Sequence, residues 1–199
     1  MIRNMFKLGI TMALYAAAAC VALAFVYEGT REQITLNETK ALEAALFEIF
    51  PGADGFAPLE EVPQSPDKSV AFSSAWTLSQ NGETRGIAIR TEAESYGGVL
   101  TCLVGLEMDK KLSGVRVLTN SDTPGLGANA ASPTYYVDKS AKTTFFGQFA
   151  GKKAGDAFAV KDDVVAITAS TITSVAVAKS VKAAALAGSS WIDTREQEK

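Results

Sequence analysis

The distribution of apolar and polar residues separates a long apolar N-terminal stretch from a mixed remainder. Residues 8–27 contain no charged side chain, and a helix of this length, at about 1.5 Å per residue, matches a bilayer core of about 30 Å. Arg3 and Lys7 precede the stretch, and this basic excess favours a cytoplasmic position for residues 1–7. We therefore expect one transmembrane helix. A cleaved signal peptide is the alternative, because Ala22-Leu23-Ala24 has the small residues of a cleavage site.

The next apolar residues recur at helical spacing. They predict a helix within residues 28–52 that links the membrane span to the folded domain, and Pro51-Gly52 is typical of its end. The residues on its apolar stripe are Leu42, Ala45, Leu46, Ile49 and Phe50. Residues 53–190 follow as a domain, and it begins with a proline-containing, acidic stretch, 53–68, which we expect to be irregular.

Alternating apolar and polar residues then predict an antiparallel sheet. A run with Phe72, Ser74, Trp76 and Leu78 on one face is followed by Asn81-Gly82, which is typical of a hairpin turn, and by a second arm. The segments that we expect to be strands are 72–78, 86–91, 99–108, 112–118 and 164–167.

The last apolar segment is predicted to be a helix that begins at a cluster of hydroxyl side chains. Hydroxyls occupy most of Thr168–Ser174, and Val177, Val181 and Ala184 recur behind them at helical spacing. The first turn of such a helix has free N–H groups and the positive end of the dipole, and both favour an anion such as phosphate. An ordinary capped helix is the alternative. We expect Gly188 to end the helix and residues 191–199 to form a polar tail.

Composition narrows the possible functions. The 199 residues carry a formal net charge of -3, so nothing supports binding to nucleic acid. The chain has no His and thus lacks the usual general base at neutral pH and the most common metal ligand. We expect no catalytic side chain and no metal site. Any chemistry then comes largely from a bound cofactor.

The hydroxyl cluster resembles a known attachment motif. Thr168-Ala169-Ser170-Thr171-Ile172-Thr173 is similar to the S/T-G-A-T/S-x-T/S motif of an FMN-binding domain family. That domain is shared by the G subunit of the Rnf electron-transport complex and the C subunit of the sodium-pumping NADH:quinone reductase. Here Ala169 stands in place of the Gly, and Ser170 in place of the Ala. The resemblance implies that Thr171 carries FMN through a phosphoester installed by a flavin transferase from FAD. Thr168, Ser170 and Thr173 are the neighbouring candidates for cofactor binding.

Two further segments extend this resemblance. Asp122-Thr123-Pro124-Gly125-Leu126-Gly127 is similar to the family's E-T-P-G-L-G loop, with Asp122 in place of the Glu, and Tyr96-Gly97-Gly98 is similar to its Y-G-G. In that family the first loop lies against the flavin. The resemblance therefore adds five candidates for cofactor binding, namely Tyr96, Thr123, Gly125, Leu126 and Gly127.

Other segments of the family pattern carry less functional information. Residues 145–152 resemble its F-x-G-Q-F-x-G-K segment, and we expect them to pack in the core with Lys152 and Lys153 solvated. The acidic residue that often stands shortly before the attachment motif is displaced here, to Asp162 or Asp163.

Together these features predict an α+β fold: a transmembrane helix followed by an extracytoplasmic FMN-binding domain, in which helices flank an antiparallel sheet. By resemblance the chain is an electron-carrier subunit of an ion-translocating ferredoxin:NAD oxidoreductase (Rnf) in the cell (inner) membrane. It has partner subunits and no turnover alone. The alternatives are the equivalent subunit of a quinone reductase, an anchored module that holds FMN or another phosphate ligand noncovalently, and a structural subunit that has lost its cofactor.

Overall fold

The computed structural model describes residues 2–197, with side chains described from Asn4 onward. The Arg3 side chain and the end of the predicted tail, 198–199, lie outside this part. The chain divides into two compact units, one up to Glu43 and one from Ala44 onward. The elements are α1 (Ile2–Ile49), β1 (Gly55–Pro58), β2 (Val70–Gln80), β3 (Glu83–Ser95), β4 (Gly98–Glu107), β5 (Leu112–Thr119), the 3-10 helix η1 (Gly127–Ala131), β6 (Tyr136–Asp138), β7 (Thr143–Thr144), the 3-10 helix η2 (Gly147–Phe149) and α2 (Thr171–Gln197).

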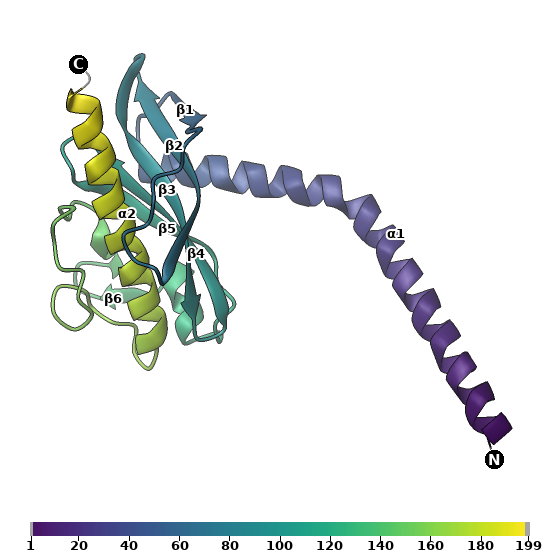
Figure 1. Cartoon of the computed structure of the whole chain (residues 1–199). Helices are drawn as coiled ribbons and strands as arrows, with labels where there is room; N and C mark the ends of the chain where they lie inside the picture. Colours follow the sequence, from purple (N-terminus) through teal and green to yellow (C-terminus); the bar gives the residue numbers. More distant parts are fainter. Residues whose placement is uncertain (1, 198–199) are drawn as a thin grey trace. The chain divides into compact units, whose positions relative to one another are not determined.

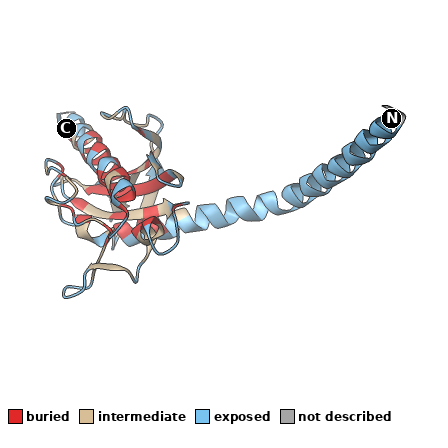
Figure 2. Cartoon of the chain, turned by 90° about the horizontal axis from the view of Figure 1, so that it is seen from below, coloured by how far each residue is buried: buried red, intermediate tan, exposed pale blue. Residues whose placement is uncertain are grey.

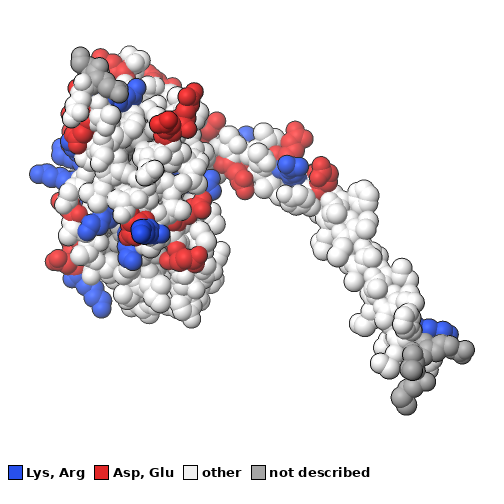
Figure 3. Space-filling view, viewed as in Figure 1, with Lys and Arg blue, Asp and Glu red and all other residues white. Residues whose placement is uncertain are grey.

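The first unit consists of helix α1 up to Glu43. Its most apolar stretch has a mean hydropathy of 2.1 and none of that stretch is buried, and Figure 3 shows a length of the helix without charged side chains. The helix is long and apolar enough to cross a membrane, which fits a single-pass membrane protein. The predicted span and the predicted linking helix are one continuous helix. It ends at Ile49, just before Pro51, as expected from Pro51-Gly52.

The second unit is built on a five-stranded antiparallel sheet in the order β1-β2-β3-β4-β5 (Figure 1). Each strand pairs with its neighbours in the sequence, and the turns at Asn81-Gly82 and Tyr96-Gly97 connect consecutive strands. The predicted α+β fold with an antiparallel sheet is confirmed. Strand β1 was not expected, because it lies within the stretch 53–68 that reads as an irregular loop.

Helix α2 covers one face of the sheet and forms the main core with it. The buried residues, red in Figure 2, lie mainly on this helix and on the strands. The helix contributes Val177 and Val181, and the sheet contributes Ile87, Ile89 and Val104. Phe145 and Phe149, from the segment predicted to pack in the core, are both fully buried there.

The end of α1 packs against the opposite face of the sheet, at a position where the strands carry glycines. A Cβ atom at Gly105 would lie 2.6 Å from the Phe50 ring, and one at Gly114 would lie 3.2 Å from Ile49. Gly105 and Gly114 are partners across β4 and β5. The missing side chains therefore leave a depression in the sheet that Ile49 and Phe50 fill, and both of these residues are buried.

One β-strand prediction placed a residue on the wrong face. The alternation put Phe72 on the same face as Trp76 and Leu78, but a register shift lies between Phe72 and Ser74. Such a bulge adds one residue and reverses which face the following side chains occupy. Phe72 therefore packs against the core under α2.

The prediction that Gly188 ends the last helix is wrong, since α2 continues to Gln197. Gly188 is buried, and a Cβ atom there would lie 2.9 Å from the Leu106 side chain and 3.3 Å from Ile87. The glycine is needed for close packing of the helix on the sheet, and tertiary contact overrides its helix-ending tendency. Most of the predicted polar tail is therefore helical.

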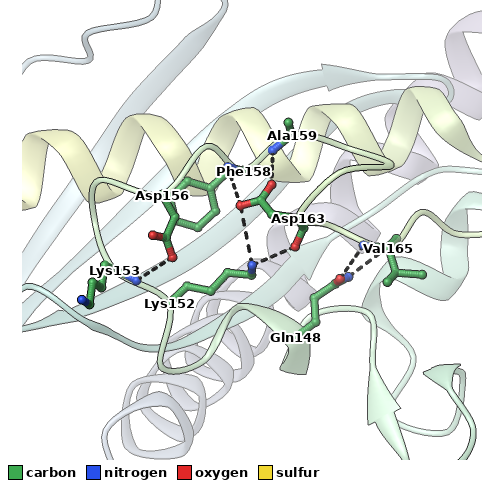
Figure 4. A network of polar contacts seen from close by, with 8 residues as sticks. All are labelled: Gln148, Lys152, Lys153, Asp156, Phe158, Ala159, Asp163 and Val165. Atoms are coloured by element: carbon green, nitrogen blue, oxygen red, sulfur yellow. Dashed lines mark hydrogen bonds and ion pairs between the residues drawn. The ribbon is translucent and has the colours of Figure 1, made fainter.

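The predicted strand at 164–167 is also absent, apart from one isolated bridge at Val164. The Gln148 side chain takes the place of a neighbouring strand: its Oε1 accepts from the Val165 N–H at 2.7 Å, and its Nε2 donates to the Val165 carbonyl at 3.1 Å (Figure 4). With both backbone groups of Val165 satisfied by one side chain, the segment needs no sheet ladder.

Candidate functional site

A cavity of about 500 Å³ lies at the start of α2. This size is within the range of about 300–1,000 Å³ typical of cofactor sites. The loop after β5 and the hydroxyl cluster, more than forty residues apart in the sequence, form its walls together with the turn between β3 and β4. Its lining residues are Tyr96, Asp122, Thr123, Leu126, Gly127, Ala169, Ser170, Thr171, Ile172 and Thr173.

The first turn of α2 presents polar groups to this cavity. The first hydrogen bond of the turn joins the Ser174 N–H to the Ser170 carbonyl at 3.0 Å, so the N–H groups of Thr171, Ile172 and Thr173 have no intrahelical acceptor. The Ser170 hydroxyl is buried and has no hydrogen-bond partner within the described residues. A buried hydroxyl of this kind requires an explanation, and a bound polar ligand supplies one. The positive end of the 27-residue helix favours an anionic ligand.

The carboxylate of Asp122 connects three segments around the cavity. Its Oδ2 accepts from the Ser95 hydroxyl at the end of β3 and from the Thr173 hydroxyl in α2, each at 2.6 Å. Its Oδ1 accepts from the Gly97 N–H in the β3–β4 turn. Asp122 thus fixes the turn, its own loop and the helix start relative to one another.

Asp122 is ionised at neutral pH although it is only 6% exposed. Burial by itself raises the pKa of the carboxyl group, but the hydrogen bonds from Ser95, Thr173 and Gly97 outweigh it and lower the pKa below its usual value. The cavity wall therefore contains a fixed negative charge whose acceptor capacity is used within the protein.

Gly127 is required where the loop approaches Asp122 and the helix. A Cβ atom at this position would lie 2.5 Å from the Thr173 hydroxyl and 2.6 Å from the Asp122 side chain. Any larger residue would displace the groups that hold the cavity wall.

Ala169 adopts a left-handed backbone conformation, with φ of 58°. Glycine takes this conformation readily, whereas a residue with a Cβ atom does so at a cost of about 1–2 kcal/mol. The attachment motif that this segment resembles has Gly at this position. The backbone path into the helix is thus the one that a glycine would adopt, and here an alanine holds it under strain.

The acidic residues before the motif have structural contacts. The Asp163 carboxylate accepts from the Phe158 N–H at 3.0 Å and from the Ala159 N–H, and it lies 3.6 Å from Lys152 Nζ (Figure 4). Burial raises the pKa of Asp163, but these backbone hydrogen bonds and Lys152 outweigh it and hold the pKa below its usual value. The prediction that Lys152 is solvated is wrong, because its Nζ also donates to the Asp163 carbonyl at 2.7 Å. Lys153 is exposed, as expected.

The cavity contains most of the predicted site residues. Two predicted residues do not line it: Thr168 is exposed, with its N–H 3.4 Å from the Tyr135 hydroxyl, and the Gly125 carbonyl accepts from Asn129. Sequence reasoning did not assign a role to Asp122 or Ile172. The only available signal for Asp122 was its position directly before the T-P-G-L-G loop.

Family comparisons agree with this geometry. The family model of the FMN-binding domain matches residues 95–186, a range that spans all the segments around the cavity. The model of the RnfG N-terminal region matches residues 1–49, which correspond to α1.

Similar proteins cover nearly the whole chain. The G subunit of an ion-translocating oxidoreductase complex from Aliivibrio fischeri is 30% identical over 92% of this chain and 90% of the relative. The G subunit of the Na(+)-translocating ferredoxin:NAD(+) oxidoreductase complex from Acetobacterium woodii is 29% identical over 88% of this chain and 87% of the relative. The crystal structure of Shewanella oneidensis NqrC shares the fold, with a TM-score of 0.51 and 16% identity over 77% of this chain and 75% of that one. The chain therefore belongs to the RnfG family of ion-translocating oxidoreductase (Rnf) complexes, as an electron-transfer subunit with an FMN-binding domain.

Proposed function

We propose that this subunit relays electrons through FMN that is bonded by a phosphoester to Thr171. FMN supplies the redox chemistry, because it accepts and releases electrons that the side chains of this protein cannot carry. The chain's own residues bind, orient and retain the cofactor. On this proposal the subunit has no turnover alone and works between partner cofactors in the complex.

The observation that carries the proposal is the difference in exposure among the hydroxyls at the start of α2. Thr171 is exposed and lines the cavity, whereas Ser170, Thr173 and Ser174 are buried. Thr173 donates to Asp122, and Ser174 donates to the Ser170 carbonyl at 2.9 Å. Among the hydroxyls of this helix turn, Thr171 is therefore the one that an external enzyme can reach, and its hydroxyl has no competing hydrogen bond within the described residues.

The installation step assigns a clear role to Thr171. Its Oγ forms a bond to the phosphorus of the FMN moiety of FAD, the bond to the AMP moiety breaks, and the hydroxyl proton is lost to the flavin transferase or to solvent. The free N–H groups of the first helical turn and the Ser170 hydroxyl would hold the phosphate and favour its negative charge.

The rim of the cavity suits a flat, largely apolar ring. Tyr96 is 73% exposed, Ile172 57% and Leu126 41%, and all three line the cavity. Large apolar side chains that remain this exposed next to a cavity are typical of a binding surface. We propose that they cover the isoalloxazine ring, with Thr123 and Gly127 closing the wall behind it.

Covalent attachment can be tested by mass spectrometry and in-gel fluorescence of denatured protein. The protein would be made together with a flavin transferase. We expect the peptide containing Thr171 to carry the mass of FMN less one water, and the fluorescent band to remain after denaturation. Thr171→Ala should abolish both signals, whereas the matched control Thr168→Ala should keep them. An unmodified Thr171 peptide from a preparation that contains flavin would refute the covalent link.

Noncovalent binding is the second candidate, and the unpartnered Ser170 hydroxyl favours it as much as it favours a covalent phosphate. In that case native protein would be yellow and acid denaturation would release all of the flavin. The same gel therefore separates the two candidates.

We also propose that α1 spans the inner membrane. The domain from residue 53 onward then lies on the extracytoplasmic side, and residues 1–7 lie in the cytoplasm. Lys7 precedes the uncharged stretch of α1 and supports this orientation. Labelling of single introduced cysteines with a membrane-impermeant thiol reagent in intact cells would test it. Labelling of Ser140→Cys is expected, and its absence, with labelling only after lysis, would contradict the orientation.

A further inference from the structure

A groove that is separate from the flavin cavity runs along α2. Part of it has a volume of about 580 Å³, and its floor is a helical stripe formed by Val175, Ala178, Lys179, Lys182, Ala183 and Leu186. An adjoining hollow of about 970 Å³ shares Pro66 and Leu186 with it and continues to Trp191. At about 1.5 Å per residue, the helix between Val175 and Trp191 is about 24 Å long. The groove is therefore elongated.

Hydrogen bonds to two aspartates hold the two walls of the first part. On one side, Asp163 binds the backbone N–H groups of Phe158 and Ala159 and so fixes the loop that lines the groove (Figure 4). On the other side, Asp67 accepts from the N–H and the hydroxyl of Ser69, each at 2.8 Å. The groove is a built feature of the domain.

Charge differs between the two halves of the groove, because three lysines and one carboxylate, that of Asp67, line the first half. Lys68, Lys179 and Lys182 are exposed around the first half, and within the described residues none of them lies within 4.0 Å of a carboxylate. In Figure 3, which has the viewpoint of Figure 1, basic side chains lie over the middle of the domain with acidic atoms among them. The second half is lined by Glu60 and Glu61 instead. In a chain with a net charge of -3, this local basic cluster is distinctive.

We propose that this groove binds an elongated amphipathic segment of another subunit of the complex, with its acidic side chains over Lys68, Lys179 and Lys182. The length suits about four turns of helix, and apolar side chains such as Leu186, which is 41% exposed, offer contact area on the floor. The arrangement selects against an anionic membrane surface or a nucleic acid, because Glu60 and Glu61 would repel phosphates along the second half. The inference rests on membership of the complex and does not depend on the flavin.

The experiment is purification of the membrane complex through a tag on a different subunit. The variant Lys179→Glu/Lys182→Glu reverses the charge of the helix stripe, and Lys139→Glu/Lys142→Glu is the matched control, because both of these lysines are exposed near the β6–β7 turn. We expect the first variant to reduce the amount of this chain retained by about tenfold or more, since like charges across an interface are strongly unfavourable. The control and Lys179→Arg/Lys182→Arg should be retained as the unchanged chain is.

Zero-length carbodiimide crosslinking of the intact complex supplies a second readout. We expect crosslinks from Lys68, Lys179 or Lys182 to Asp or Glu residues of one segment of another subunit. Unchanged retention together with no such crosslink would overturn the proposal, as would crosslinks that connect only two copies of this chain. Loss of binding to phosphatidylglycerol vesicles with full retention in the complex would show a lipid site and would also overturn it. Thermal unfolding of the variant shows whether the fold is intact. Because no flavin signal is used, these outcomes are independent of attachment at Thr171.

Discussion

Two aspartates, Asp122 and Asp163, hold loops near the hydroxyl cluster, but they differ in exposure and in the segments that they bind. Asp122 is 6% exposed and binds groups from three separate segments. The Asp163 side chain is 27% exposed and binds the backbone of its own loop together with Lys152. Both carboxyl groups have a lowered pKa. The difference lies in what would replace each carboxylate if it were lost, since water can reach the position of the partly exposed Asp163 carboxylate more easily than that of the buried Asp122 carboxylate.

Removal of each carboxylate should therefore give the largest difference in the free energy of unfolding between the two sites. We expect Asp122→Ala to lower the free energy of unfolding by about 3 kcal/mol, because it leaves the buried Thr173 hydroxyl without its acceptor and also removes the acceptor of the half-buried Ser95 hydroxyl and of the Gly97 N–H. Asp163→Ala should cost about 1 kcal/mol, because water replaces the lost acceptor. Chemical denaturation of the full chain in detergent measures both, with Asp162→Ala as the control. Equal losses for the two variants would mean that burial of Asp122 does not matter.

The pH dependence sharpens the same comparison. Because the pKa of Asp122 is lower in the folded protein than in the unfolded chain, its contribution is fully present above about pH 4 and is lost as the pH falls through the folded value. We expect Asp122→Asn to be less stable than the unchanged protein at pH 7, and the difference to shrink below about pH 4. A difference that stays constant from pH 7 to pH 3 would show that the charge of Asp122 contributes nothing.

Removal of one hydrogen-bonding or charged partner of each carboxylate should have a smaller effect on stability. Thr173→Val keeps the shape of a side chain that is 1% exposed but removes its hydrogen bond to Asp122, at a cost of about 1.5 kcal/mol. Lys152→Met removes a partly exposed ion pair with Asp163 and should cost below about 1 kcal/mol. Thermal or chemical unfolding compares them. If Lys152→Met proves the more damaging change, the loop held by Asp163 has the greater structural importance.

The smallest effect is expected at Ala169, the strained residue that precedes the first turn of α2. Ala169→Gly relieves a positive φ, and after the entropic cost of glycine in the unfolded chain it should stabilise the protein by about 0.5 kcal/mol. Ala166→Gly, at a residue without a positive φ, should instead destabilise it by about 0.5 kcal/mol. A loss of stability in Ala169→Gly, measured by denaturation, would show that the alanine carries no strain.

Much of the fold was predictable because its determinants are local. Alternation and the Asn81-Gly82 turn predicted the hairpins, and the two loops that resemble the family motif do meet at one cavity. The residues that were not predicted act over distance. The partners of Asp122 lie 25 to 51 residues away, and no periodicity reveals them.

The wrong predictions at 164–167 and at Gly188 have a related cause. In both places a tertiary contact outweighs the local sequence preference. Gln148 satisfies the backbone of Val165 from 17 residues away, so an apolar run that resembles a strand does not join the sheet. Gly188 contributes close packing on Leu106 and does not end its helix. In each case a long-range partner, which the sequence pattern does not identify, decides the outcome.

The exposure of Thr171 in a well-packed helix start has a consequence for the order of biogenesis. In an unfolded chain every hydroxyl of the cluster would be equally available, and an enzyme would have to choose among them by sequence alone. Once α2 has docked on the sheet, Thr168 and Thr171 remain exposed, and of these two Thr171 lines the cavity. On the proposed attachment at Thr171, folding would come first and modification second, and the folded surface of the domain would be the substrate of the flavin transferase.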